Sequence, residues 1–257
     1  MTSIYLLTDF GNDDYYVGAM KGVIRSICPS ANILTISNGV RKFNVKHGAF
    51  LLWQAIKWIE EGSIVLGVVD PGVGTARDPI IIRANSFTFV GPDNGLFWPA
   101  IEELGDYEVY KIDLISTGLY KRRTGTFDGR DVFAPIAAYI ACGKSLDELG
   151  FPKRSIEIID LWKVDIKEGY LRGEVMNVDR FGNIVTNIKW NALRAERARI
   201  KVKNVIAQGY MAKNYSGKGV LMLKGSTGLL EISLARGSAA NYFEADIGDP
   251  ISLEVIK

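Results

Sequence analysis

Along the first 150 residues, short apolar runs alternate with segments whose apolar positions recur every three to four residues. The runs predict strands and the recurrences predict helices, because a helix brings every third or fourth side chain onto one face. The predicted strands are 4–7, 33–36, 63–69, 80–82 and 87–90, and the predicted helices are 13–27, 45–59 and 131–142. Repeated strand–helix–strand units predict an α/β domain with a mostly parallel sheet and helices on both faces.

The pattern changes after Lys153, where apolar and polar residues alternate in short stretches separated by glycine, as in 170–175 and 200–205. Such alternation is typical of strands with one buried face. A helix is expected only over Asn191 to Ala198. The sequence therefore predicts an α/β domain over 1–155 and an all-β, sandwich- or barrel-like domain over 165–257.

Polar residues follow the predicted strands at the points where ligands bind in open α/β sheets. Asp70 and Arg77 flank a tight turn of proline and glycine after the strand 63–69. This pair could position water or a polar substrate, or it could clamp the turn. Asp9 follows the first strand, where it could cap the next helix or accept the hydroxyls of a ribose. Residues 92–95, Pro-Asp-Asn-Gly, are interpreted as a structural turn.

The composition argues against several function classes. The 257 residues, 47% of them hydrophobic and 23% charged, suffice to bury a core. The net charge of +2 gives no electrostatic case for nucleic acid or a membrane surface, and the basic cluster 121–123 is expected to be a solvated loop. No apolar run approaches ~18 residues and no signal sequence is evident, which predicts a soluble, cytoplasmic protein.

Cysteine and histidine are scarce. Cys28 and Cys142 lie far apart among apolar or small residues, which predicts buried free thiols in a reducing cytosol. His47 is the single histidine and no Cys-x-x-Cys occurs, so no transition-metal site is expected. His47 itself lies in a helical pattern and is expected to be an ordinary helix residue. The chain also lacks the two glycine-rich phosphate-binding motifs.

Taken together, the loops resemble those of a known family, the S-adenosylmethionine (SAM) hydroxide adenosyltransferases. These SAM hydrolases are relatives of fluorinase and chlorinase. The segments that match in order are 8–11 (TDFG), 68–75 (VVDPGVGT), 92–95 (PDNG), 129–135 (GRDVFAP), 179–187 (DRFGNIVTN), 230–232 (LEI) and 237–240 (GSAA). The resemblance spans nearly the whole chain. It implies an α/β domain followed by a β-barrel-like domain, a homotrimer with sites between neighbouring subunits, and SAM as the substrate without a cofactor.

Matched position by position, the resemblance implies roles at the ribose and the methionine end of SAM. Asp9 would hold the ribose 2′ and 3′ hydroxyls, and Phe127 would line the pocket near C5′. Tyr16 and Asp179 would contact the methionine, with Ser226 nearby. Asp179 would accept a hydrogen bond from the methionine ammonium.

The adenine end of the site is implied to come from the barrel-like domain of a neighbouring subunit. Asn183 would bind the adenine edge and Tyr210 would stack near the ring. The backbone around Ser238 and Ala239 would help to recognise the base.

The implied reaction is attack of water on C5′ of the sulfonium, which releases methionine and adenosine. In the family an Asp, an Arg and a His are held responsible for activating the water, and Asp70 and Arg77 match the first two. Asp128 stands where the histidine belongs, in Thr-Phe-Asp-Gly-Arg-Asp. The pair 37–38, Ser-Asn, replaces a second family histidine. The catalytic set is therefore predicted to be Asp70, Arg77 and Asp128.

Asp128 leaves three hypotheses. It could accept a proton from water, with Arg77 between two carboxylates keeping both ionised. Two close carboxylates could instead share a proton. Alternatively, the protein could bind SAM or adenosine with little turnover, or use another nucleophile. The family's halogenases have Tyr in place of Asp70, and two carboxylates would repel a halide. The remaining site residues favour hydrolysis.

Overall fold

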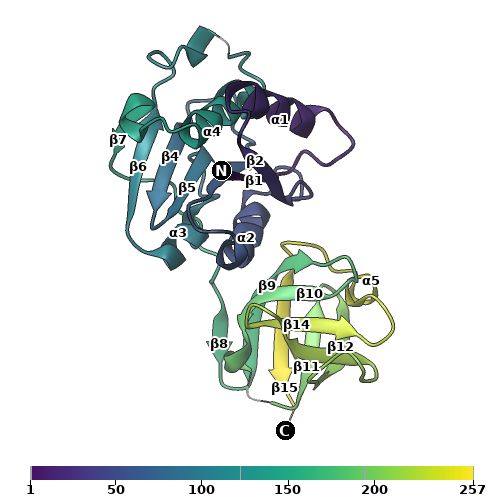
Figure 1. Cartoon of the computed structure of the whole chain (residues 1–257). Coiled ribbons are helices and arrows are strands. Elements are labelled where there is room, and N and C mark those ends of the chain that lie inside the picture. Colours follow the sequence, from purple (N-terminus) through teal and green to yellow (C-terminus); the bar gives the residue numbers. More distant parts are fainter. Residues whose placement is uncertain (1, 122, 194, 257) are drawn as a thin grey trace. The chain divides into compact units, whose positions relative to one another are not determined.

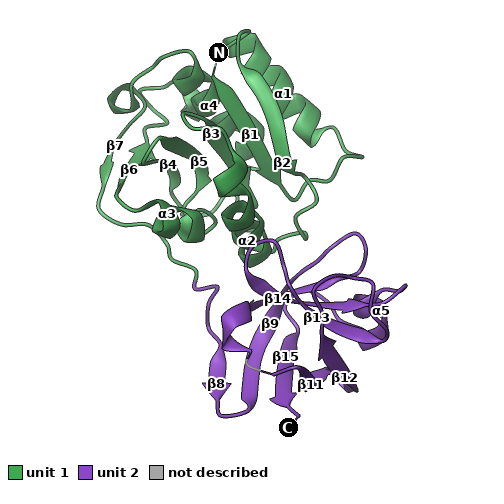
Figure 2. Ribbon diagram, turned by 60° about the horizontal axis from the view of Figure 1, so that its bottom comes forward, with its two compact units in different colours: residues 1–159 green, residues 160–257 purple. Residues whose placement is uncertain are grey.

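The computed structural model describes residues 2–121, 123–193 and 195–256, and the chain divides into two compact units. The first is Met1–Ile159 and the second Asp160–Lys257 (Figure 2). Within the described part of the chain, every helix is too short or too polar to cross a lipid bilayer.

The first unit is built on a seven-stranded sheet with the order β2-β1-β3-β5-β4-β6-β7. Its strands are β1 (Ser3–Thr8), β2 (Asn32–Ser37), β3 (Ile64–Val68), β4 (Pro79–Ala84), β5 (Phe87–Pro92), β6 (Tyr107–Ile112) and β7 (Gly150–Lys153). Pairings β1–β2, β1–β3 and β3–β5 are parallel, whereas β4 is antiparallel to both neighbours and β7 to β6. Five strands thus share one direction, which confirms the predicted mostly parallel sheet.

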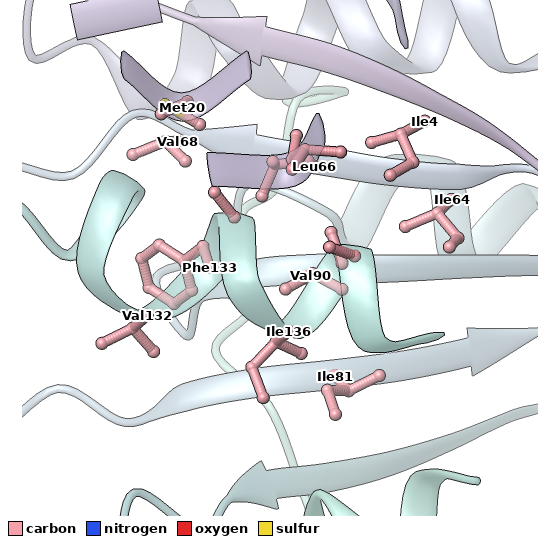
Figure 3. Packing of buried hydrophobic residues seen from close by; sticks show 14 of the residues in the cluster. Ile4, Met20, Ile64, Leu66, Val68, Ile81, Val90, Val132, Phe133 and Ile136 are labelled. Carbon is pink, nitrogen blue, oxygen red and sulfur yellow. The ribbon is translucent and has the colours of Figure 1, made fainter. Parts of the chain in front are cut away.

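Helices cover both faces of this sheet (Figure 1). They are α1 (Tyr16–Ile27), α2 (Val45–Ala55), α3 (Trp98–Leu104) and α4 (Ala134–Ala141). On β3, Ile64, Leu66 and Val68 pack with α1 and α4 (Figure 3), while Val65 packs on the opposite face with α2 and α3. The central strand is buried on both faces, which explains why its sequence is an uninterrupted apolar run.

Some element boundaries differ from the sequence prediction. The first helix begins at Tyr16, after four exposed residues. The helix predicted over 131–142 begins earlier, as a wide turn over Gly129–Phe133 that leads into α4. Pro135 has no N–H to donate, and the N–H of Ala134 donates five residues back to Gly129. The short α3 was not predicted, because its seven residues include a proline and show little periodicity. Strand β6 was not predicted either.

The free-thiol prediction is wrong, because Cys28 and Cys142 form a disulfide. Cys28 follows the last residue of α1 and Cys142 follows the last residue of α4. These two helices pack against each other on one sheet face, which brings the Cα atoms to 5.7 Å. A separation of 114 residues in the sequence conceals this proximity.

The second unit is a closed barrel. Its strands are β9 (Tyr170–Val178), β10 (Ile184–Lys189), β11 (Arg197–Val202), β12 (Val205–Met211), β13 (Val220–Lys224), β14 (Leu229–Leu234) and β15 (Pro250–Val255). The order β10-β14-β13-β12-β11-β15-β9 closes through the pairing of β9 with β10, which confirms the barrel-like prediction. The short β8 (Asp165–Lys167) extends the sheet beside β9, and α5 (Ala239–Phe243) packs on the barrel core.

The helix predicted over 191–198 is wrong. Trp190–Ala192 form a single 3₁₀ turn and β11 begins at Arg197, while Arg194 lies outside the described residues. Along β11, exposed and buried side chains alternate, and Ala198 enters the barrel core. Packing on the barrel therefore decides this segment in favour of a strand.

Candidate active site

A pocket of about 350 Å³ opens in the first unit beside residues that follow β1 and β3. Asp9 comes directly after β1, and Asp70 comes two residues after β3. Because β1 and β3 are parallel neighbours, their carboxyl ends meet at one edge of the sheet. The lining residues on which the site argument rests are Asp9, Phe10, Tyr16, Asp70, Phe127 and Asp128. The structure thus brings together five of the predicted site residues.

The three residues of the predicted catalytic set form one charged network. Arg77 Nε donates to Asp70 Oδ1 at 3.1 Å, and its Nη2 pairs with Asp70 Oδ2. The same Nη2 donates to Asp128 Oδ2 at 2.6 Å. The side chain of Asp128 is 1% exposed and that of Arg77 is 9% exposed. Arg77 therefore lies between two carboxylates, as the sequence predicts.

A fourth residue, Arg123, completes this network and was missed by the sequence analysis. Its Nε donates to Asp128 Oδ1 and its Nη2 to Asp128 Oδ2, both at 2.7 Å. The prediction of a solvated loop over 121–123 is therefore wrong for Arg123, although Lys121 is exposed as expected and Arg122 lies outside the described residues. The guanidinium of Arg123 binds the buried carboxylate of Asp128, five residues further along the chain. The nearness of Asp128 in the sequence was the only sign of this contact.

The two guanidinium groups determine the protonation of Asp128. Burial raises the pKa of this carboxyl, but hydrogen bonds from Arg123 and Arg77 outweigh that effect and leave the pKa below its ordinary value. A proton shared between Asp128 and Asp70 is disfavoured, because Arg77 lies between them and every oxygen of Asp128 accepts from a cation. On Arg77, Nη1 is buried without a hydrogen-bond partner among the described residues.

Close backbone packing holds the Asp70 turn in place. Gly74 has a φ of +79°, and a Cβ there would lie 2.7 Å from the carbonyl oxygen of Gly125. The turn can therefore pack on the segment that carries Asp128 only because residue 74 lacks a side chain. Asn94 Nδ2 donates to the carbonyl of Val69 at 2.8 Å, which fixes the residue before Asp70. The interpretation of 92–95 as a structural turn is confirmed.

Aromatic rings form one wall of the pocket. Phe10, Tyr16 and Phe127 contact one another with ring centroids 5.1 to 5.6 Å apart. Phe43, also at the pocket, was missed by the sequence analysis and is 71% exposed. It has a φ of +62°, and its N–H donates to Asp9 Oδ2 at 2.8 Å. Its contribution comes from tertiary folding alone, since no motif marks that loop.

Asp9 supplies a third carboxylate to the pocket, besides Asp70 and Asp128. Burial raises its pKa, the hydrogen bond from Phe43 N–H opposes this, and the net direction is upward. Asp9 lines the same pocket as Phe10, Tyr16 and Phe127. It does not cap α1, whose first turn has no side-chain cap.

Asn38 and His47 each form hydrogen bonds within the first unit. Asn38, at the position where the sequence resemblance implies a histidine, accepts from Thr8 Oγ1 at 3.1 Å and donates to Asn12 Oδ1 at 3.0 Å. His47 lies in α2, and its Nδ1 accepts from Arg41 N–H at 2.9 Å. The interpretation of His47 as a helix residue is confirmed.

The second unit has its own pocket, which includes Asp179 and Asn183. Asp179 Oδ1 accepts from the N–H groups of Phe181 and Asn183 at 2.9 Å, and its Oδ2 accepts from Asn183 Nδ2 at 2.8 Å. Tyr215 and Phe181 also line this pocket and were missed by the sequence analysis. Asp179 therefore shapes its own loop and presents the Asn183 side chain.

A hydrogen-bonded pair lies beside this second pocket. Tyr215 Oη donates to Glu231 Oε1 at 2.7 Å. This bond raises the pKa of Tyr215 to about 12. Burial raises the pKa of Glu231 above its ordinary value, although the tyrosine hydroxyl opposes the shift.

The other residues predicted to bind adenine and methionine occupy different surroundings. Ser238 caps α5 through its Oγ and lies against Gly182, where a Cβ would come within 2.1 Å of that oxygen. Ala239 is fully buried in the barrel core. Tyr210 is half-exposed on β12, and Ser226 lies in the turn between β13 and β14. None of these four is among the described residues that line the pocket of Asp179 and Asn183.

Among the residues that the structure describes, no group of three or more His, Cys, Asp and Glu side chains is arranged to hold a metal ion. The four-residue network at the first pocket contains two carboxylates, but both are taken up by guanidinium groups.

Comparison with known proteins identifies the family. The model of the SAM hydroxide adenosyltransferase N-terminal domain matches residues 4–150, and the model of the C-terminal domain of the same family matches residues 173–252. The chain belongs to the SAM hydroxide adenosyltransferase family. The sequence resemblance to this family is thereby confirmed.

Relatives of this family member match it along nearly its full length. A protein of Thermus thermophilus named (R)-S-adenosyl-L-methionine hydrolase is 34% identical, with 98% of this chain and 100% of the relative covered. A protein of Methanocaldococcus jannaschii with the same name is also 34% identical, with 97% and 95% covered. A crystal structure of a conserved protein from Thermotoga maritima superposes with a TM-score of 0.89 at 35% identity, covering 97% of this chain and 99% of that one.

Proposed function

We propose that the protein hydrolyses S-adenosyl-L-methionine to adenosine and L-methionine. The observation that carries the proposal is that Asp70, held by Arg77, lines the same pocket as Asp9 and the aromatic wall. A carboxylate for ribose hydroxyls and a carboxylate for water are thus available in one cavity. The relatives' names support this substrate. Because these names specify the (R) epimer at the sulfonium, the epimer that this protein accepts must be tested as well.

In the proposed reaction, the oxygen of water attacks C5′ in line with the C–S bond. The bonding pair of that C–S bond moves to sulfur, which leaves as the neutral thioether of methionine. The attacking water loses one proton, and Asp70 accepts this proton or polarises the water. The sulfonium is already a good leaving group, so neither an acid nor a cofactor is needed.

The family resemblance implies the roles of the other pocket residues, and their chemistry supports these roles. Asp9 accepts hydrogen bonds from the ribose hydroxyls, and Phe127 and Tyr16 pack near C5′ and the methionine end. Asp128 is a poor base, because two guanidinium groups lower its pKa. We therefore assign Asp128 the task of holding Arg77, and leave the water to Asp70.

The carboxylates also bear on the choice of nucleophile. The network with Arg77 and Arg123 is neutral as a whole, but the two members of it that line the pocket are the carboxylates of Asp70 and Asp128. The charges nearest to the substrate therefore oppose a halide and favour a cationic sulfonium. Water is therefore the nucleophile that we propose.

We further propose that the protein works as a homotrimer. Asp9, which is assigned to the ribose, lines a pocket of the first unit, and Asn183, which is assigned to the adenine edge, lines a pocket of the second unit. Asp179 and Asn183 of a neighbouring copy would complete the binding site, with Tyr210, Ser226, Ser238 and Ala239 as the further substrate contacts. Light scattering tests this: a mass of three chains supports it, and a monomer at assay concentration refutes it.

We also propose that the protein is cytoplasmic. The disulfide between Cys28 and Cys142 opposes this placement, since structural disulfides are rare in a reducing cytosol outside hyperthermophiles. Fractionation of the native cells, followed by antibody detection, decides between cytoplasm and an oxidising compartment.

The test of the activity is to incubate the purified protein separately with the (S) and (R) epimers of SAM. Adenosine and methionine are then quantified by chromatography. Equal amounts of both products, lost in Asp70→Ala and kept in the exposed-site control Asp106→Ala, support the hydrolase. Measurable SAM binding by calorimetry without either product would instead indicate a binding protein. Chloride- or fluoride-dependent consumption without adenosine would indicate a halide transferase.

A further inference from the structure

Arg123 binds the buried carboxylate of Asp128 through two nitrogens of its guanidinium. Nε reaches one carboxylate oxygen of Asp128 and Nη2 reaches the other, both at 2.7 Å. This two-pronged geometry fixes the plane of the carboxylate as well as its position. Arg77 then bonds one of the same two oxygens from the other side.

We propose that Arg123 is a positioning residue for the hydrolysis, whose guanidinium fixes the Asp128 carboxylate so that Arg77 remains on Asp70. The inference rests on the proposed function for its kinetic consequences. Arg123 is not among the described residues that line the pocket, so it acts through Asp128 and not by touching substrate.

The order of charges shows why the fourth residue is needed. Asp70, Arg77, Asp128 and Arg123 form a chain of alternating sign whose charges sum to zero. Without Arg123, one guanidinium would face two carboxylates, and Asp128 is 1% exposed. An uncompensated buried charge is costly. The network would respond by protonating Asp128 or by drawing Arg77 away from Asp70.

Arg123 is the member of the network that solvent reaches most. Its side chain is 23% exposed, against 1% for Asp128 and 9% for Arg77. A hydrogen bond from Arg123 is also the foremost cause that lowers the pKa of Asp128. Its removal must therefore raise that pKa.

The test compares Arg123→Gln and Arg123→Lys with the wild-type protein. The matched control is Lys121→Gln, which removes one positive charge from an exposed side chain of the same segment. Values of kcat and KM are measured from about pH 4 to about pH 9. The carboxyl carbon of Asp128 is titrated by ¹³C NMR in parallel, with its signal assigned through Asp128→Asn.

For Arg123→Gln we expect kcat at neutral pH to fall about tenfold, equivalent to one charge-assisted hydrogen bond, while KM stays within about twofold. The acid limb of the kcat/KM profile moves upward by about one pH unit or more, and so does the Asp128 titration. Arg123→Lys keeps part of the activity, because an ammonium supplies the positive charge but not the two parallel hydrogen bonds of a guanidinium. Lys121→Gln behaves as the wild type.

An Arg123→Gln protein with the wild-type pH profile and an unmoved Asp128 titration would overturn the proposal. Lower stability alone, with both pH readouts unchanged, would show a merely structural role and would also overturn it. If Arg123→Gln does not fold, Arg123→Lys carries the same readouts. If the wild type itself forms no adenosine, the proposed function fails, and the NMR titration still decides whether Arg123 controls Asp128.

Discussion

Replacing Asp128 with Asn tests how much the buried charge network contributes to the stability of the first unit. The substitution preserves shape but removes a carboxylate that accepts three hydrogen bonds from two guanidinium groups. Arg77 is left as a buried cation with one carboxylate partner, and the new amide nitrogen faces donors with which it cannot bond. Removing one partner from a buried ion pair costs about 3–5 kcal/mol. Because Arg123 is 23% exposed and can turn to solvent, we expect about 3 kcal/mol.

The pH dependence of that loss has a definite sign. The pKa of Asp128 is lower in the folded protein than its ordinary value, so its stabilisation is fully present above that ordinary value. It is lost as the pH falls through the folded pKa. The stability difference between wild type and Asp128→Asn should therefore be constant near neutral pH and shrink below about pH 4.

The assay is urea unfolding, followed by hydrogen-exchange mass spectrometry so that peptides of the first unit report separately from those of the second. Asp106→Asn, at an exposed position of the same unit, is the control. A loss below about 0.5 kcal/mol at pH 7, the range of ordinary surface substitutions, would refute the reasoning. So would a loss that is equally large at pH 3.

Further predictions concern three other features. Replacing both Cys28 and Cys142 with Ser should cost about 2–4 kcal/mol of unfolding free energy, because the disulfide closes a long loop; a denaturation midpoint equal to the wild type would contradict this. Gly74→Ala should cost about 1–3 kcal/mol and reduce kcat, since the new Cβ meets a facing carbonyl at positive φ; denaturation and kinetics check both effects. Tyr215→Phe removes the hydroxyl that lowers the pKa of Glu231, so a ¹³C titration should show this already raised pKa rising further.

The arrangement of the α/β unit could be predicted because its signals are local. The apolar run around Leu66 and the helical face of Met20 and Ile24 each fit one secondary structure, and both lie in the core where the pattern requires. Local signals fail where packing decides. Ala198 belongs to a segment that resembles a helix in composition, yet its side chain completes the barrel core as part of β11.

At the site, the sequence supplied residues adjacent to strand ends, and the parallel sheet brought them together. Asp9 and Asp70 could be placed beside each other because β1 and β3 are parallel. The placement of Arg77 between two carboxylates came from the family resemblance, which puts Asp128 where the histidine belongs. Phe43 could not be found, since its loop returns to Asp9 only through the tertiary fold. The binding roles assigned through the family resemblance stay predictions.

By itself, the sequence determined the fold class, the family and the position of the charged turn, because periodicity and motif spacing are properties of neighbouring residues. The tertiary structure alone decided that Cys28 forms a disulfide with Cys142 and that the Arg123 guanidinium binds Asp128. The disulfide depends on the packing of α1 against α4, and the Arg123 contact depends on the burial of the Asp128 carboxylate. The energy of a buried charge depends on every group that surrounds it, and no stretch of neighbouring residues contains that information.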